Sequence, residues 1–395
     1  MVDEDQALTS YKHLFSRAFA AAPERIHFAA HSHHLWPDAS YAGHMRAWDD
    51  AAALADRKWD KIFGEVIPRA QANIAHELKL PDPRTIGFAP NTHELIMRLF
   101  SARRPGKIEV LTTDGEFHSF RRQSARWEED GWIRRRIVPF EPFATFTERF
   151  LAAMRERQPD IAFLSHVMFR SGLRFDGAAE LASYAAPDGT WVALDLYHSF
   201  MAMPCDFSAI ADRVFLLGGG YKYAMAGEGA GYIHAPPGFA PRPSFTGWFA
   251  DFCAMEGKQA GVGYSADGAR FLGATYDATG LYRFNAVQAM LASEGLDTPA
   301  ISARCAALRE NMIGMIEASE AGVLREAEMV RPNAAPPNAR FIALRHPKAV
   351  EWKAALMAAN IITDARDDVL RIGFGLYQDE ADVPAFCAAA ARVLG

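Results

Sequence analysis

Short apolar runs alternate along the chain with stretches in which apolar positions recur at helical spacing. A short run bounded by turn residues is typical of a strand buried in a parallel sheet, and a spacing of three or four residues is typical of an amphipathic helix. The runs that predict strands are 25–30, 85–89, 107–112, 132–138, 161–166, 191–194, 214–217, 231–234, 341–345 and 369–373. Helical spacing is found at 41–80, 91–102, 281–294 and 299–318. The alternation predicts an α/β protein with a mainly parallel sheet flanked by helices.

The same pattern predicts the domain organisation. A proline-bounded link at 332–337 precedes the strand at 341–345. We expect a large domain at 56–280 and a smaller α+β C-terminal domain at 281–395. The N-terminal segment, 1–55, is expected to pack with the small domain.

Composition and charge narrow the function classes. The 395 residues carry a formal net charge of −6, and half of them are hydrophobic. Because the arginines form no basic stripe, we expect no nucleic-acid partner and no membrane surface. No apolar run approaches membrane-spanning length and no signal peptide is visible, so a cytoplasmic location is predicted. The four cysteines lie far apart without a Cys-x-x-Cys pair, which fits a reducing compartment and predicts no zinc site.

The candidate chemistry gathers between 191 and 232. The strand at 191–194 delivers Asp195 and His198 to its C-terminal end, where open α/β sheets bind ligands. The next strand ends in three glycines followed by Tyr221, Lys222 and Tyr223. The apolar surroundings of Lys222 favour a lowered pKa and a free amine, which Schiff-base chemistry with a carbonyl or pyridoxal phosphate needs. The alternative is an incidental lysine in a glycine-rich turn.

Asp195 strengthens the pyridoxal interpretation, because a carboxylate beside the pyridine nitrogen makes the ring an electron sink. The Asp-x-x-His of Asp195 and His198, with the Tyr-Lys-Tyr around Lys222, resembles the cofactor core of fold type I pyridoxal-phosphate enzymes of aminotransferase class V. Within that class the chain is most similar to kynureninase. The resemblance implies a cofactor-binding large domain, Lys222 and Asp195 as catalytic residues, and His198 and Tyr221 as cofactor contacts. It also implies an α-amino acid substrate and a homodimer.

Other cofactor contacts are predicted at three further segments. Thr92 and His93 open a helix whose N–H groups suit a phosphate, although an ordinary helix cap explains them equally. By resemblance, Phe117 covers the pyridine ring, unless it is a core phenylalanine. By resemblance, Trp248 reaches the phosphate and Thr275 crosses to the phosphate of the partner subunit.

Candidate substrate contacts lie near both ends of the chain. Arg371 lies on an apolar strand, where a buried cation needs an anion. An internal carboxylate could supply that anion, and the resemblance implies the substrate α-carboxylate. Ser32 with its neighbouring histidines is expected to line the substrate pocket, rather than a metal site, and Arg170 could meet a substrate carboxylate, the cofactor phosphate or surface acids. The histidines of that segment are His31, His33 and His34.

Departures from the kynureninase pattern predict an altered substrate. Phe120 replaces the family's aspartate, and Thr275 is followed by Tyr276 and Asp277 where kynureninases have two prolines. We therefore predict a kynureninase-like carbon–carbon bond hydrolase or lyase on another α-amino acid. The alternatives are a class V aminotransferase and a non-catalytic ligand-binding protein of this fold.

A nicotinamide dehydrogenase is the remaining rival, because three glycines alternate at 227, 229 and 231. Their spacing is not the dinucleotide fingerprint, and they precede a strand instead of opening a helix. The sequence therefore favours the pyridoxal-phosphate interpretation.

Overall fold

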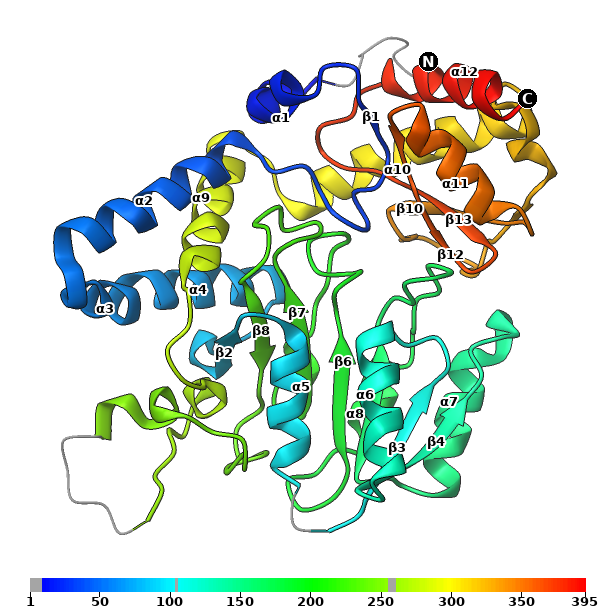
Figure 1. Cartoon of the computed structure of the whole chain (residues 1–395). Coiled ribbons are helices and arrows are strands. Elements are labelled where there is room, and N and C mark those ends of the chain that lie inside the picture. The colour runs from blue at the N-terminus through cyan, green and yellow to red at the C-terminus, as the bar shows by residue number, and fades with distance from the viewer. Residues whose placement is uncertain (1–8, 104–105, 255–260) are drawn as a thin grey trace, which may run out of the picture.

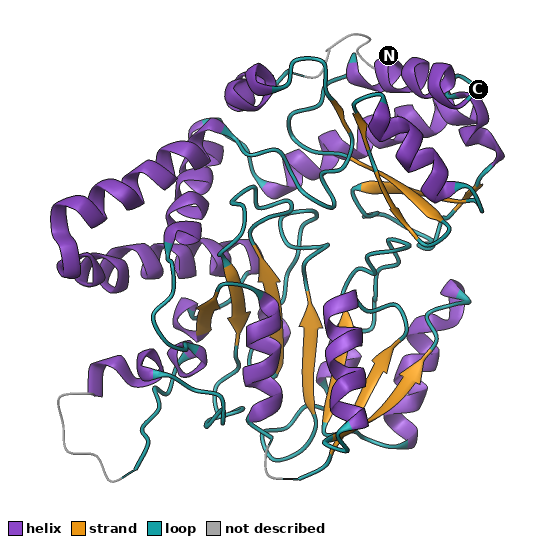
Figure 2. Ribbon diagram, viewed as in Figure 1, coloured by secondary structure: helices purple, strands orange, loops and turns teal. Residues whose placement is uncertain are grey.

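A seven-stranded sheet forms the centre of the larger half of the computed structural model, which describes residues 9–103, 106–254 and 261–395. Its strand order is β2-β8-β7-β6-β5-β3-β4, with β8 antiparallel to both of its neighbours and the other pairs parallel. The strands are β2 (Ile86–Ala89), β3 (Ile108–Thr113), β4 (Ile133–Val138), β5 (Ile161–Ser165), β6 (Trp191–Asp195), β7 (Val214–Gly219) and β8 (Gly231–His234). The predicted mainly parallel α/β fold is confirmed (Figures 1 and 2).

Helices cover both faces of this sheet because successive strand residues point to opposite faces. Phe163 and Phe215 pack with α5 (Thr92–Ser101) and α6 (His118–Glu129) on one face. On the other face, Leu164 and Leu216 belong to the same core cluster as α7 (Phe146–Glu156) and α8 (Ala178–Ala182). The inner strands β5, β6 and β7 are therefore buried on both sides, which explains why they read as continuous apolar runs in the sequence.

A helical layer flanks the β2 edge of the sheet (Figure 1). It contains α2 (Asp38–Leu54), α3 (Lys58–Lys61), the π-helix Ile62–Val66, α4 (Ile67–Leu78) and α9 (Thr279–Ser293). Gly43 allows α2 to approach α9 closely, since a Cβ there would lie 2.7 Å from the carbonyl oxygen of Tyr282.

The C-terminal part is built on a four-stranded antiparallel sheet of order β12-β13-β10-β9. Its strands are β9 (Glu328–Met329), β10 (Phe341–Arg345), β12 (Asp364–Arg366) and β13 (Val369–Gly373), and its helices are α10 (Thr298–Glu317), α11 (Ala349–Ala358) and α12 (Asp382–Leu394). The predicted helix at 299–318 thus begins one residue earlier, where Asp297 caps it by accepting a hydrogen bond from the Ala300 backbone N–H at 2.8 Å.

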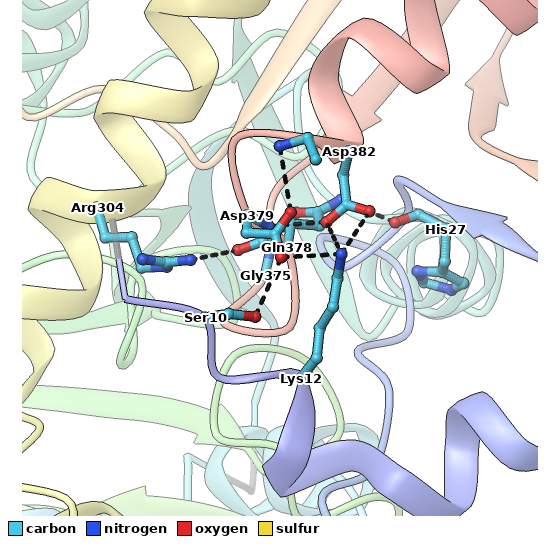
Figure 3. Close-up of polar contacts among 9 residues, drawn as sticks. Ser10, Lys12, His27, Arg304, Gly375, Gln378, Asp379 and Asp382 are labelled. Atoms are coloured by element: carbon cyan, nitrogen blue, oxygen red, sulfur yellow. Dashed lines mark hydrogen bonds and ion pairs between the residues drawn. The ribbon is translucent and has the colours of Figure 1, made fainter. Parts of the chain in front are cut away.

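The beginning of the chain is attached to this C-terminal part. After a short 3₁₀ turn (Lys12–Phe15) and α1 (Ser16–Ala21), β1 (Ile26–His27) pairs in parallel with β11 (Ile361–Ile362). A polar cluster adds to the attachment (Figure 3). In it, Lys12 Nζ lies 2.9 Å from a carboxylate oxygen of Asp379, and Gln378 Nε2 donates to the His27 carbonyl at 2.8 Å.

None of the helices within the described ranges is long and apolar enough to cross a membrane.

Candidate active site

The C-terminal end of β6 faces the C-terminal part (Figure 1). A cavity of about 340 Å³ opens there, lined by residues that include Ser165 at the end of β5 and Asp195 at the end of β6. Its walls bring together seven of the predicted residues: Thr92, His93, Phe117, Asp195, His198, Tyr221 and Lys222. The remaining lining residues are Asn91, Ile96, Ser119, Phe120, Ser165, Val167, Phe169 and Tyr197. This is the strand end at which parallel sheets bind ligands.

Lys222 is 5% exposed in the turn after β7. Its Nζ lies 2.7 Å from His198 Nε2 and 5.1 Å from the centre of the Tyr197 ring. Burial, followed by the nearby positive charge of Arg371, lowers the pKa of the Lys222 amine to about 7. Near neutral pH a large share of this amine is therefore unprotonated.

The glycines of the turn make room for this arrangement. A Cβ on Gly219 would collide with the phenol oxygen of Tyr197, which lines the cavity. The turn is closed by the Ala226 N–H, which donates to the Gly220 carbonyl at 2.8 Å. The glycines that precede Lys222 therefore allow the backbone to hold it beside Tyr197.

Asp195 ends β6 beside the cavity. Its Oδ1 accepts a hydrogen bond from the Tyr197 N–H at 2.9 Å. Burial raises the pKa of the Asp195 carboxyl, while the positive charge of Lys222 acts in the opposite direction. Burial also holds the pKa of His198 well below its usual range, so this imidazole is neutral.

The N-terminus of α5 forms another wall of the cavity. Asn91 caps the helix by accepting a hydrogen bond from the Glu94 N–H at 3.1 Å. Thr92 and His93 line the cavity, and the Nδ1 of His93 has no hydrogen-bond partner among the described residues. Free backbone N–H groups and the helix dipole make this wall suited to an anion such as a phosphate.

Sequence reasoning missed Glu116. Its carboxyl is 1% exposed and is held by Ser165, whose N–H lies 3.0 Å from one oxygen and whose hydroxyl lies 2.7 Å from the other. Burial raises the pKa of Glu116 to about 8. Ser165 is the register partner of Asp195. The only hint in the sequence was its position directly before Phe117, a predicted cofactor contact.

Arg371 meets an internal carboxylate that sequence reasoning did not identify. It is 2% exposed on β13, forms an ion pair with Asp364 of β12, and donates through Nη1 to the Phe169 carbonyl at 2.5 Å. Arg366 binds the other oxygen of Asp364 at 3.0 Å. Asp364 and Arg371 are direct cross-strand partners, so the hairpin register places them together.

The histidine segment lies against the C-terminal part. His31 is fully buried, with its Nε2 3.8 Å from Asp364 Oδ2. His34 donates through Nδ1–H to the Leu35 carbonyl at 2.7 Å, and burial lowers the pKa of this imidazole to about 3. Ser32 Oγ lies 3.2 Å from His33 Nδ1. No group of three or more side chains that could hold a metal occurs within the described ranges.

Like Arg371 and the histidine segment, three further predicted site residues are not among those that line the cavity. Arg170 forms ion pairs with Asp368 at 2.6 Å and Asp367 at 3.5 Å, both in the turn between β12 and β13. Trp248 and Thr275 lie together, with the indole N–H donating to the threonine hydroxyl at 3.1 Å. Their predicted roles stay predictions.

Comparison with protein families adds an independent observation. A family model described as the kynureninase C-terminal domain matches residues 301–389. The kynureninase of Deinococcus radiodurans is 30% identical over 240 residues, which are 59% of this chain and 57% of that protein. The isopenicillin N epimerase of Streptomyces clavuligerus is 30% identical over 176 residues, 40% of each chain. The chain thus spans roughly half the length of the curated relatives it matches.

Solved structures share the fold over nearly the whole chain. The cystine C–S lyase C-DES, in complex with its reaction product cysteine persulfide, has a TM-score of 0.79 at 18% identity and covers 95% of this chain and 99% of that one. The apo cysteine desulfurase of Thermococcus onnurineus NA1 has a TM-score of 0.77 at 16% identity and covers 98% and 99%. At these identities the likeness concerns the fold alone.

Proposed function

Because the chain is related to kynureninases and has the fold of class V, fold type I pyridoxal-phosphate enzymes, we propose that it uses pyridoxal phosphate to act on an α-amino acid. The observation that carries the proposal is the buried Lys222 amine in one cavity with the Asp195 carboxyl and the α5 N-terminus. Those are the three groups that this cofactor needs: an amine, an anion for the ring nitrogen and a phosphate site.

The side chains of the cavity fit the cofactor. Lys222 would carry it as an imine, Asp195 would hold the protonated ring nitrogen, and Thr92 with His93 would receive the phosphate. Phe117 borders the same space, and the Lys222 Nζ lies 5.6 Å from the centre of its ring. When bound, the cofactor supplies an electron sink for a carbanion at the substrate Cα.

Lys222 is also suited to move the Cα proton. A general base works best with a pKa near the working pH, and burial brings this amine to about 7. The neutral His198 ring can accept a hydrogen bond from Nζ through Nε2 at 2.7 Å. His198 would thereby orient the lone pair of Lys222 whenever the amine is free.

For the reaction type we propose a kynureninase-like carbon–carbon bond hydrolase or lyase with an altered substrate. Support for the alteration comes from Phe120, which lines the cavity and stacks on Phe163 with ring centres 3.9 Å apart. A hydrophobic wall thus replaces the acid expected for kynureninase. A class V aminotransferase is the second candidate, because it needs the same lysine, carboxyl and Cα proton transfer.

We also propose that the working form is a homodimer. The α2 side chains Tyr41, Met45 and Trp48 form one exposed apolar stripe, and Trp48 is 70% exposed. Trp48 and Thr275 line the same groove, so the stripe and the residue expected to serve the partner's phosphate share one surface. Two-fold dimers bury such self-complementary surfaces.

The test begins with the cofactor. Purified protein should absorb in the visible range, lose that band with borohydride and carry the pyridoxyl label on Lys222. Lys222→Ala should lose the band, whereas Lys348→Ala, on an exposed turn, should keep it. In protein stripped of cofactor, the rate of pyridoxal-phosphate addition should rise with pH through about 7 and then level off, because the unprotonated amine reacts. Label on another lysine would refute the proposal.

The reaction type is tested by screening amino acids. Release of alanine would support the kynureninase-like proposal, and conversion of the cofactor to its amine form with a 2-oxo acid would support the aminotransferase. Alanine release from kynurenine at ordinary enzyme rates would contradict the altered substrate. Binding of amino acids without any turnover across the screen would favour a non-catalytic protein.

A further inference from the structure

The ion pair between Asp364 and Arg371 opposes the role that the resemblance to kynureninase implies for this arginine, which is to bind the substrate α-carboxylate. One guanidinium nitrogen of Arg371 is bound to Asp364 and another donates to the Phe169 carbonyl. A substrate carboxylate that reaches Arg371 therefore meets a resident carboxylate first. Two carboxylates on one guanidinium repel each other unless one of them has another partner.

Two such partners surround Asp364. Arg366 already binds its Oδ1 at 3.0 Å, and its side chain is more exposed than that of Arg371. The His31 Nε2 lies 3.8 Å from Oδ2, just beyond hydrogen-bond reach. A small displacement of the Asp364 carboxylate toward His31 would close this gap.

His31 is a buried polar group that lacks a hydrogen-bond partner among the described residues. Its side chain is fully buried, and neither ring nitrogen has a hydrogen-bond partner among the described residues. Buried polar groups are almost always hydrogen-bonded, so an unpaired imidazole needs an explanation. Gly373 keeps the ring in this place, because a Cβ there would collide with His31 Nδ1.

Arg366 and Arg371 both bind the single carboxylate of Asp364. Arg366 and Arg371 carry two positive charges and Asp364 carries one negative charge, which leaves one positive charge. A single substrate carboxylate neutralises it. An amino acid amide, which lacks that negative charge, would not.

Building on the proposed function, we propose that Asp364 is a resident carboxylate that holds Arg371 while the site is empty. When a substrate carboxylate takes Arg371, Asp364 moves onto Arg366 and His31. Competition from Asp364 thereby lowers the affinity of the site for any substrate carboxylate. His31 offsets part of this effect, because it stabilises the displaced Asp364. Asp364 and His31 together determine how much a carboxylate contributes to the binding affinity of a substrate.

The experiment measures Kd for L-alanine from the change in the visible spectrum of the holoenzyme. Asp364→Asn removes the competing charge and should lower the Kd about tenfold, the effect expected of one charge-assisted hydrogen bond. L-alaninamide should bind both proteins equally. Asp212→Asn is the matched control, since Asp212 is exposed before β7 and pairs with Arg213. It should leave the Kd unchanged.

A double-mutant cycle tests the role of His31. His31→Gln should raise the Kd for L-alanine about threefold to tenfold in the wild-type background, and less than about twofold when Asp364 is already Asn. Additive effects would show that His31 acts without Asp364. A higher Kd in Asp364→Asn would show that Asp364 positions Arg371 for the substrate. Either result would overturn the proposal.

A readout without cofactor separates this proposal from the proposed function. Propionate should raise the melting temperature of the apo form of Asp364→Asn more than that of apo wild type, because Arg371 is then free to bind it. Equal shifts in melting temperature for the two apo proteins would overturn the proposed displacement of Asp364, even if the holoenzyme is never obtained. Absence of the visible band in wild type would instead count against the proposed function. If Asp364→Asn does not fold, Asp364→Ser is measured in its place.

Discussion

At the scale of single residues, burial sets the charges around the cavity. It lowers the pKa of Lys222 and raises the pKa of Asp195 and Glu116, because a low-dielectric environment disfavours the charged form of any group. Lys222 and Asp195 favour each other's charged forms by their mutual attraction. Glu116 has no such partner in the part of the chain that the structure describes: its hydrogen bonds come from Ser165, and the nearby Asp195 opposes its ionisation.

We predict that Glu116→Gln flattens the pH dependence of stability. The Glu116 carboxyl titrates near 4.5 in the unfolded chain and at about 8 in the folded protein, so the native state binds more protons between these values. Wild type should therefore lose stability as the pH rises through this window, by on the order of 3 kcal/mol. Melting temperatures between about pH 5 and pH 8 measure the effect.

The glutamine variant keeps the hydrogen bonds without the titration, so its melting temperature should change less over the same window. Glu351→Gln, on the exposed face of α11, is the control and should follow wild type. Parallel curves for Glu116→Gln and wild type would show that Glu116 ionises normally.

At the scale of elements, the turn after β7 depends on its glycines. Gly219→Ala would push a methyl group into the phenol of Tyr197, and we predict a cost of about 1 to 3 kcal/mol in stability together with weaker cofactor retention. Gly314→Ala is the control, because no described residue outside its own turn of helix lies within 4 Å of its Cβ position on the exposed face of α10. It should stabilise the protein by about 0.5 to 1 kcal/mol. Denaturant unfolding compares the two, and an unaffected Gly219→Ala would contradict the steric argument.

Most elements could be predicted because their residues carry local signals. The buried strands are continuous apolar runs, and Asn91 marks the start of α5. Asp195 and Lys222 could be brought together because β6 and β7 are consecutive parallel strands whose ends meet at one edge.

The Asp364–Arg371 pair was missed for a physical reason. β12 is only three residues long and polar, so no apolar run marks it. The signal that could have found it is the pair Asp367 and Asp368, which forms the hairpin turn before β13. Glu116 was missed because sequence does not reveal that a carboxyl is buried.

At the scale of the whole molecule, the exposed stripe on α2 predicts the assembly. Trp48→Glu places a charge at the centre of the proposed interface, so the dimer should dissociate at micromolar concentration and the cofactor should be retained less well. Val350→Glu introduces the same charge on α11, at a residue that is also exposed, and should remain dimeric. Light scattering gives the mass of each. A wild-type monomer that retains its cofactor would refute the interface.

The parallel pairing of β1 with β11 has a consequence for synthesis on the ribosome. Ile26 and His27 leave the ribosome long before their partners Ile361 and Ile362 are translated. Until then the nascent chain carries the apolar residues Phe28, Ala29 and Ala30 unpaired, as a stretch that chaperones can bind. A premature stop codon before β13 would leave His31 without the strand it packs against, even though the strands that present Lys222 would be complete.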